Sequence, residues 1–221
     1  MTRRLYDLAA ADESVRFSPF CWRTKLALAH KNLDYETVPW HFTDKPEIAF
    51  SGSDKVPVLV DGDRVVADSQ AIAEYLDETY MNEPPLFGEP PARALTNFIR
   101  AWADRVLQPA LVPILLPDIF PRLAAQDKDY FRSSREARLG CTLEELGARR
   151  EAAVAALQPV LAPLLATLKA QTFIAGEAPN YADHIVFGAL QWARIMSSTT
   201  LFEADGTLGT WMQSVLETYG L

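Results

Sequence analysis

The sequence is poor in cysteine, histidine and positive charge. Of its 221 residues only two are cysteine and three are histidine, and 29 acidic residues outnumber 21 basic ones, which gives a formal net charge of −8. Two cysteines, Cys21 and Cys141, are too few for a disulfide framework and fit a reducing compartment. The histidines, His30, His41 and His184, show no metal-ligand spacing, so we expect no metal site. The acidic balance argues against nucleic acid and anionic membrane surfaces as partners.

The sequence also lacks a long uninterrupted apolar run. A membrane-spanning helix needs ~20 apolar residues, and the longest run, near 107–116, contains Gln108, Pro109 and Pro113. Near the N-terminus, Asp7 interrupts the chain before any apolar segment of signal-peptide length. We therefore expect a cytoplasmic protein with no membrane partner.

The composition is otherwise that of a globular protein, and the prolines indicate how it is divided. Hydrophobic residues make up 49% and charged residues 23% of the chain, and this length suits one or two domains. Residues 81–91 include four prolines and show no periodicity. They are typical of a linker. We therefore predict a first domain over 1–81, a linker over 82–91 and an all-helical second domain over 92–221.

The first half reads as a small α/β unit. The segment from Val56 to Val66 has two apolar runs flanking Asp61-Gly62, the strongest short signal for a β-hairpin. The order β-α-β, then a hairpin, then a helix builds a mixed sheet with helices packed against it. The predicted elements are strands near 3–8, 35–38, 56–60 and 65–66, helices over 19–31 and from 68–69 to about 80, and a long loop over 39–55.

The second half shows helical periodicity almost throughout. We expect a long helix over 92–116 that Pro117 and Pro121 end, a polar connection over 122–134, a helical pattern over 135–169, a buried helix starting near 179–183 and a short last helix over 208–219. Pro159 and Pro163 should kink or divide the pattern in which they lie. Asn180 and Asp183 predict a capping box for the buried helix.

The stretch 17–25 is the first candidate for chemistry. Ser18 stands at the N-cap position of the first helix, and Pro19 occupies the first helical turn. A hydroxyl at a helix N-terminus is suited to an anion, because unpaired N–H groups and the helix dipole point toward that spot. A thiolate is one such anion. By itself, this stretch favours an ordinary serine cap over a functional site.

Three motifs in order carry a resemblance to a known family. They are Ser18-Pro19-Phe20, the run Lys55-Val56-Pro57-Val58-Leu59 followed by Asp68-Ser69, and the segment 176–183. Together they resemble the cytosolic glutathione transferases, which join a thioredoxin-like N-terminal domain to an all-helical domain. The run 18–31 is most similar to the serine-type branch that holds bacterial lignin β-aryl etherases and related fungal transferases.

The resemblance implies roles for individual residues toward glutathione as co-substrate. Ser18 would stabilise the glutathione thiolate, and it need not lose its own proton. Pro57 would be cis, and the backbone N–H and C=O of Val56 would pair with the cysteinyl part of glutathione. The family also implies a homodimer and a small apolar electrophile, for which residues of the first long helix line a pocket between the domains.

The two ends of glutathione would bind to further residues. Ser69 and the helix N-terminus would hold the γ-glutamyl carboxylate, and Asp68 would hold its ammonium group; plain helix capping is the alternative for both. Lys55, or else His41 or Lys45, would meet the glycyl carboxylate.

Cys21 marks a departure from redox relatives of this fold. The pair Ser18 and Cys21 reads Ser-x-x-Cys where those relatives have Cys-x-x-Cys, which argues against disulfide exchange. We expect Cys21 to be a small buried residue. The residues therefore favour an enzyme that adds glutathione to an electrophile, including displacement at aryl ethers. A non-catalytic protein that binds glutathione or apolar ligands is the alternative, and glutathione-dependent reduction or isomerisation is a third.

Overall fold

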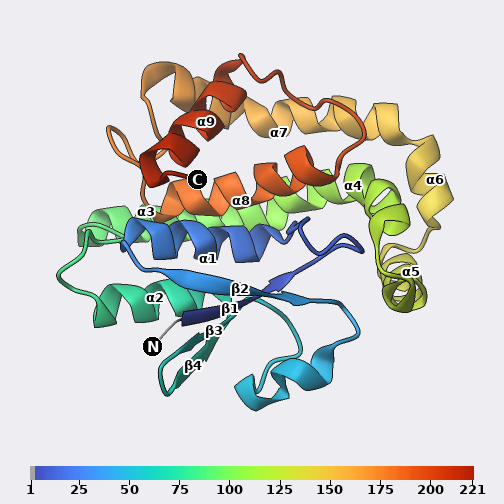
Figure 1. Ribbon diagram of the computed structural model, residues 1–221. Coiled ribbons are helices and arrows are strands. Elements are labelled where there is room, and N and C mark those ends of the chain that lie inside the picture. Colours follow the sequence, from blue (N-terminus) through green and yellow to red (C-terminus); the bar gives the residue numbers. More distant parts are fainter. Residues whose placement is uncertain (1–2) are drawn as a thin grey trace.

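A computed structural model describes residues 3–221 (Figure 1). The first part is a four-stranded sheet in the order β2-β1-β3-β4, with β1 parallel to β2 and antiparallel to β3. This is the α/β thioredoxin-like arrangement that the sequence predicts. Its elements are β1 (Arg3–Leu8), α1 (Pro19–His30), β2 (Tyr35–Trp40), the 3₁₀ helix η1 (Lys45–Ser51), β3 (Val58–Asp61), β4 (Arg64–Ala67) and α2 (Ser69–Thr79).

The predicted hairpin is confirmed in detail. Strands β3 and β4 pair antiparallel from Asp61 opposite Arg64 to Val58 opposite Ala67. Gly62 in the connecting turn has a φ of 59°, a left-handed conformation that glycine adopts without steric cost. Val58 and Leu59 point to opposite faces of the sheet and are both fully buried, so the start of β3 is covered on both faces.

The second part is helical. Its elements are α3 (Pro90–Trp102), the π-helical segment η2 (Ala103–Leu107), α4 (Gln108–Arg122), α5 (Ala125–Leu139), α6 (Leu143–Ala148), α7 (Arg150–Ala170), α8 (Tyr181–Met196) and α9 (Thr207–Tyr219). Helix α8 begins with the predicted capping box, because Asn180 accepts from the N–H of Ala182 and Asp183 accepts the N–H of Asn180.

The prediction that Pro117 and Pro121 end the first long helix is wrong. Helices α3, η2 and α4 follow one another without a break, and α4 continues to Arg122 with both prolines inside it. Proline removes a helical hydrogen bond. Here α4 also buries Leu111, Ile114 and other apolar side chains, and such tertiary burial overrides local propensity.

The expected polar connection over 122–134 is also wrong. Most of this segment belongs to α5, which buries Asp127 and Phe131. The helical pattern predicted over 135–169 is divided, but not at its prolines. It breaks at Gly140, whose φ is 69°, and at Thr142, which caps α6. Pro159 and Pro163 instead lie inside the continuous helix α7.

Helix α7 corrects the expectation that no segment is long and apolar enough for a membrane span. The most apolar stretch within its 21 residues has a mean hydropathy of 1.5, and 17% of that stretch is buried. Length and composition do not by themselves distinguish a membrane helix from a packed one. In this structure α7 buries Leu157, Leu161 and Leu164 and packs against α4, α6 and α9.

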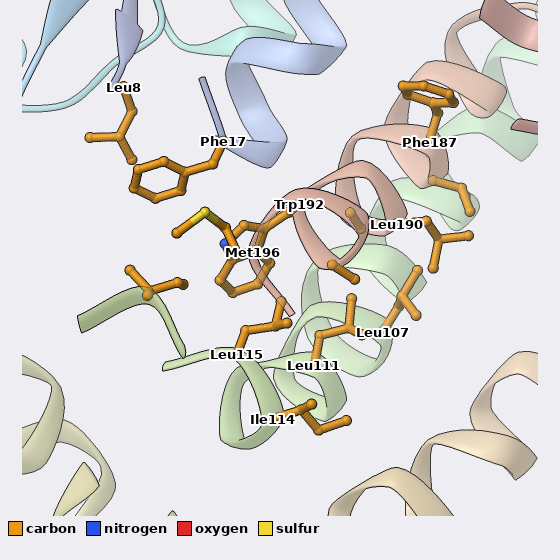
Figure 2. Packing of buried hydrophobic residues seen from close by; sticks show 14 of the residues in the cluster. Leu8, Phe17, Leu107, Leu111, Ile114, Leu115, Phe187, Leu190, Trp192 and Met196 are labelled. Atoms are coloured by element: carbon orange, nitrogen blue, oxygen red, sulfur yellow. The ribbon is translucent and has the colours of Figure 1, made fainter. Parts of the chain in front are cut away.

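One hydrophobic core runs from the sheet into the helical part. Helix α1 lies between the sheet and α8, and α7 and α9 lie beyond α8 (Figure 1). Figure 2 shows Leu8 and Phe17 of the first part facing Trp192 and Met196 of α8. Helices α1 and α8 approach each other so closely at Gly188 that an added Cβ would overlap the carbonyl oxygen of Pro19. The N-terminus of α1 is thus fixed by the second part of the chain.

Candidate active site

A cavity of about 550 Å³ lies between the first part of the chain and helices α4 and α5. This volume is typical of sites for small molecules. Its walls combine a few polar groups with many aromatic and aliphatic side chains. They are Leu8, Phe17, Ser18, Pro19, Phe20, Trp40, Phe42, Asp54, Lys55, Val56, Gln108, Val112, Leu116, Ile119, Tyr130, Phe131, Ser134, Arg135, Arg138 and Trp192.

Ser18 caps α1 and lines this cavity. Its Oγ accepts a hydrogen bond from the N–H of Cys21 at 3.2 Å, and the residue is 3% exposed. The hydroxyl of Ser18 keeps a proton that it can donate while Oγ accepts this bond. It is therefore available to a ligand, next to the helix N-terminus that favours negative charge.

Cys21, one turn later, is fully buried. Burial raises the pKa of its thiol well above the ordinary value, and the nearby carboxylate of Asp7 raises it further. A protonated thiol is a poor nucleophile. The prediction that Cys21 is a small buried residue is confirmed.

The Val56–Pro57 peptide bond is cis, as the resemblance implies. Val56 lines the cavity and precedes β3. Within the described chain neither its N–H nor its C=O has a hydrogen-bond partner. These two groups form a short free edge to which an extended peptide-like ligand can bind.

Asp68 and Ser69 begin α2 behind this edge and do not line the cavity itself. The N–H of Asp68 donates to the carbonyl of Pro57 at 3.2 Å. Its carboxylate accepts from the N–H groups of Gln70 and Ala71 through one oxygen. Asp68 has a φ of 79°, a strained conformation that is concentrated at functional sites. Asp68 can therefore cap α2 and still offer its other carboxylate oxygen to a ligand.

Tyr181 is a positioning residue that sequence reasoning missed. This fully buried side chain of α8 donates its hydroxyl to the carbonyl of Ser69 at 2.7 Å. The bond joins residues 112 positions apart. Only the buried-helix pattern around Asn180 indicated its neighbourhood, and nothing local indicated its partner.

The three candidates for a carboxylate differ in their surroundings. Lys55 lines the cavity and has no ion pair within residues 3–221. His41 does not line the cavity; its ring nitrogens lie 3.0 Å from Asp44 Oδ2 and 3.3 Å from the carbonyl of Ala10. Lys45 pairs with Asp54 at 3.3 Å. Of these candidates only Lys55 combines a free charge with the cavity wall.

Helix α5 supplies the functional residues that the sequence reading missed. Tyr130, Phe131, Ser134, Arg135 and Arg138 all line the cavity. Tyr130, Phe131 and Ser134 lie in the segment expected to be a polar connection over 122–134, whereas Arg135 and Arg138 lie in the helical pattern predicted over 135–169, where neither was given a role. The missed signal is the helical spacing of Phe131, Ser134 and Arg138, which places them on one face.

An ion pair between the two parts of the chain supports the α1 side of the cavity. The side chain of Arg23 on α1, 2% exposed, lies 2.6 Å from Asp104 of η2. Gln108 lines the cavity and donates to the same oxygen of Asp104 at 3.0 Å. No cluster of three or more His, Cys, Asp or Glu side chains suited to a metal occurs in the described chain.

Comparison with known proteins gives matches along nearly the whole chain. Residues 14–84 match the model of the glutathione S-transferase N-terminal domain, and residues 94–218 match that of the C-terminal domain. A probable glutathione S-transferase from Glycine max is 33% identical over 105 residues, 44% of this chain and 47% of that protein. The chain thus aligns with about half the length of this relative.

Relatives that align over more of the chain are also glutathione transferases. The probable glutathione S-transferase GSTU6 from Oryza sativa subsp. japonica is 28% identical over 183 residues, 79% of this chain and 68% of that protein. The solved glutathione transferase GSTFuA3 from Phanerochaete chrysosporium superposes with a TM-score of 0.88 at 26% identity, covering 99% of this chain and 97% of that one. With both domain models matched in order, the chain belongs to the glutathione S-transferase family.

Proposed function

We propose that this protein is a serine-type glutathione S-transferase that adds the glutathione thiolate to a small apolar electrophile. One observation carries the proposal: Ser18 places a hydroxyl at the N-terminus of α1 in the wall of the cavity. A free thiol has a pKa near ~8.5, so only a few per cent is ionised at neutral pH. A hydroxyl donor at a helix N-terminus lowers the pKa of a thiol bound there and increases its thiolate fraction.

The rest of glutathione has matching groups in this wall and at the start of α2 beside it. The free N–H and C=O of Val56 suit the cysteinyl backbone, beside cis-Pro57. The Ser69 end of α2 suits the γ-glutamyl carboxylate, and the second carboxylate oxygen of Asp68 suits its ammonium group. Lys55 is our first candidate for the glycyl carboxylate, ahead of His41 and Lys45.

The electrophile would occupy the part of the cavity that α4 and α5 line. Val112, Leu116 and Ile119 present an aliphatic wall there, with Trp192 beside it. The thiolate attacks an electrophilic carbon, the C–S bond forms, and the leaving group departs with its electron pair. At an aryl ether the leaving group would be a phenolate. The buried thiol of Cys21 argues against reduction by disulfide exchange.

Replacement of Ser18 tests the proposal. Ser18→Ala removes the donor to the thiolate, and a hydrogen bond to a charged group is worth about 1.5–3 kcal/mol, so kcat/KM for glutathione conjugation should fall roughly 10- to 100-fold. The pKa of bound glutathione, followed by ultraviolet absorbance of the thiolate, should rise toward ~8.5. Ser18→Thr should restore part of the rate because it retains a hydroxyl.

The control is Thr142→Ala, which removes the side-chain cap of α6 and lies outside the cavity lining. Loss of a cap costs about 1 kcal/mol of stability, so this variant separates lost stability from lost catalysis. An unchanged rate in Ser18→Ala would remove Ser18 from the mechanism. Calorimetry with glutathione, followed by a panel of a chloronitrobenzene, an isothiocyanate, a hydroperoxide and a β-aryl ether, separates conjugation from binding without turnover.

We further propose that the protein is a homodimer of the cytoplasm. Leu95 and Phe98 on α3 are 67% and 69% exposed. Large exposed apolar side chains close together often mark an interface. Gel filtration should give about twice the mass of 24.6 kDa, and Phe98→Glu should shift the protein toward the monomer. A monomer at every concentration would contradict the dimer and leave the transferase proposal intact.

A further inference from the structure

The cavity is positively charged although the protein is acidic. Its lining includes the basic residues Lys55, Arg135 and Arg138 and one acid, Asp54. That acid already pairs with Lys45. The chain as a whole carries a formal net charge of −8. The excess of positive charge is thus local to the cavity, and Lys55 accounts for only one of the three basic groups.

Arg135 is the most distinctive of these groups. Its guanidinium carbon lies 4.8 Å from the ring centre of Phe42, 4.7 Å from that of Phe131 and 5.7 Å from that of Tyr130. Such contacts hold a guanidinium in place through its attraction to the ring faces. Desolvation by these surroundings lowers the pKa of Arg135. A desolvated cation gains strongly from an anionic partner.

No such partner is present in the described chain. The guanidinium of Arg135 donates to Ser134 Oγ at 2.8 Å and forms no ion pair within residues 3–221. Asp127 carries a nearby carboxylate, but its two oxygens accept hydrogen bonds from Phe42 and Thr43. By contrast, Arg132 on the same helix pairs with two glutamates at 2.9 Å each.

We propose that the electrophile of this enzyme is an aryl compound carrying an anionic group such as a carboxylate, and that Arg135 binds that group. This inference rests on the proposed transferase function and narrows its substrate class. The planar guanidinium offers parallel N–H donors that match the two oxygens of a carboxylate. The rings of Phe42 and Phe131 and the apolar wall of α4 suit an aromatic body, and Arg138 adds charge at the exposed end of the same helix.

The test compares a chloronitrobenzoate with the matching neutral chloronitrobenzamide. In both reactions glutathione thiolate forms a C–S bond at the carbon bearing chlorine, chloride leaves with the C–Cl electron pair, and the thiol proton passes to solvent. Each rate is divided by its uncatalysed rate to remove intrinsic reactivity. The ratio of kcat/KM for the benzoate over the benzamide should fall roughly tenfold or more in Arg135→Met, because a charged hydrogen-bonded pair is lost.

The matched control is Arg132→Met, which changes net charge equally on the same helix but lies outside the cavity lining. It should leave the ratio unchanged. Arg135→Lys should give an intermediate ratio, since it keeps the charge and loses the paired donors. An equal loss for both substrates in Arg135→Met, or an equal fall in the ratio in Arg132→Met, would overturn the proposal.

A binding measurement separates this inference from the transferase proposal. Calorimetry with unreactive nitrobenzoate and nitrobenzamide should show tighter binding of the benzoate, and that preference should disappear in Arg135→Met. A preference for the benzoate in a protein without turnover would contradict the transferase and support the anion site. Turnover without any preference for the benzoate would support the transferase and contradict the anion site. A loss of glutathione affinity in Arg135→Met with no change for the benzoate would assign Arg135 to glutathione and overturn the inference.

Discussion

Ser18 and Cys21 lie three residues apart on the first turn of α1, and their surroundings give them opposite chemistry. Ser18 Oγ accepts the N–H of Cys21 and belongs to the wall of the cavity. The thiol of Cys21 points into the core, 3.9 Å from the carbonyl of Tyr6, and burial raises its pKa. Cys21 is therefore unsuited to act as a nucleophile.

Labelling with an alkylating agent checks this contrast. In the folded protein near neutral pH, Cys21 should stay unlabelled because its protonated thiol is buried, whereas Cys141 is only partly buried and should be modified first. Mass spectrometry of peptides from native and urea-unfolded samples measures both sites. Modification of native Cys21 at the rate of Cys141 would contradict the structure.

The N-cap position of Ser18 and the burial of Cys21 could be predicted from the sequence because their signals are local. A serine before Pro19 predicts an N-cap from backbone chemistry alone. Arg135 could not be predicted in this way. Its contacts with Phe42 and Phe131 join two segments, and only the folded chain shows that no acid pairs with it.

At the scale of elements, α1, α8 and α9 meet around three polar rings. The hydroxyl of Tyr219 lies 2.8 Å from His30 Nδ1 and 2.8 Å from His184 Nε2. Burial lowers the pKa of both histidines, and for His184 the neighbouring His30 lowers it further. This junction therefore packs well only while His184 is neutral.

Stability should consequently fall in mild acid. In the unfolded chain His184 binds a proton near pH ~6.5, whereas in the folded chain its lowered pKa keeps it neutral, so the free energy of unfolding decreases as the pH falls below ~6.5. His184 alone should contribute about 1.4 kcal/mol of loss between about pH 7.5 and about pH 5.5. Urea unfolding at the two pH values measures it.

The control is His184→Gln, which replaces the imidazole with an uncharged amide. This change removes the proton-binding group at position 184. The variant should lose that part of the pH dependence and keep the part due to His30 and other groups. An identical pH dependence in His184→Gln and the unaltered protein would contradict the assignment.

The success of prediction also differed between elements. The hairpin around Gly62 and the capped start of α8 were confirmed because turn and cap residues act locally. Helices α4 and α5 were misjudged because their prolines and charges are locally unfavourable, and burial of Leu111 and Phe131 decides their structure. The division into residues 1–81, 82–91 and 92–221 stays a prediction.

On the scale of the whole molecule, Gly188 of α8 is a point of close contact between the two parts. Gly188→Ala would force its Cβ against the carbonyl oxygen of Pro19, so we expect a loss of about 1–3 kcal/mol of stability or more. Because Pro19 follows Ser18 directly, kcat/KM should fall as well. Thermal unfolding and conjugation kinetics measure the two effects.

Gly147→Ala is the matched control. Gly147 lies in α6, where an added Cβ would meet only the Cβ of Pro117 at 3.9 Å. Alanine favours a helix by up to about 1 kcal/mol over glycine, so stability should stay the same or rise, with activity unchanged. Equal effects of the two substitutions would show that the contact at Gly188 is unimportant.

The contact at Gly188 bears on whether the two halves of this chain can be recombined. Ser18 belongs to the first half, but its placement depends on Gly188, which lies 170 positions later and has no side chain. A chimera that joins residues 1–81 to the helical half of another protein should therefore retain this serine geometry only where the graft also leaves room beside Pro19. Ser18 and the space beside Pro19 would have to be inherited together.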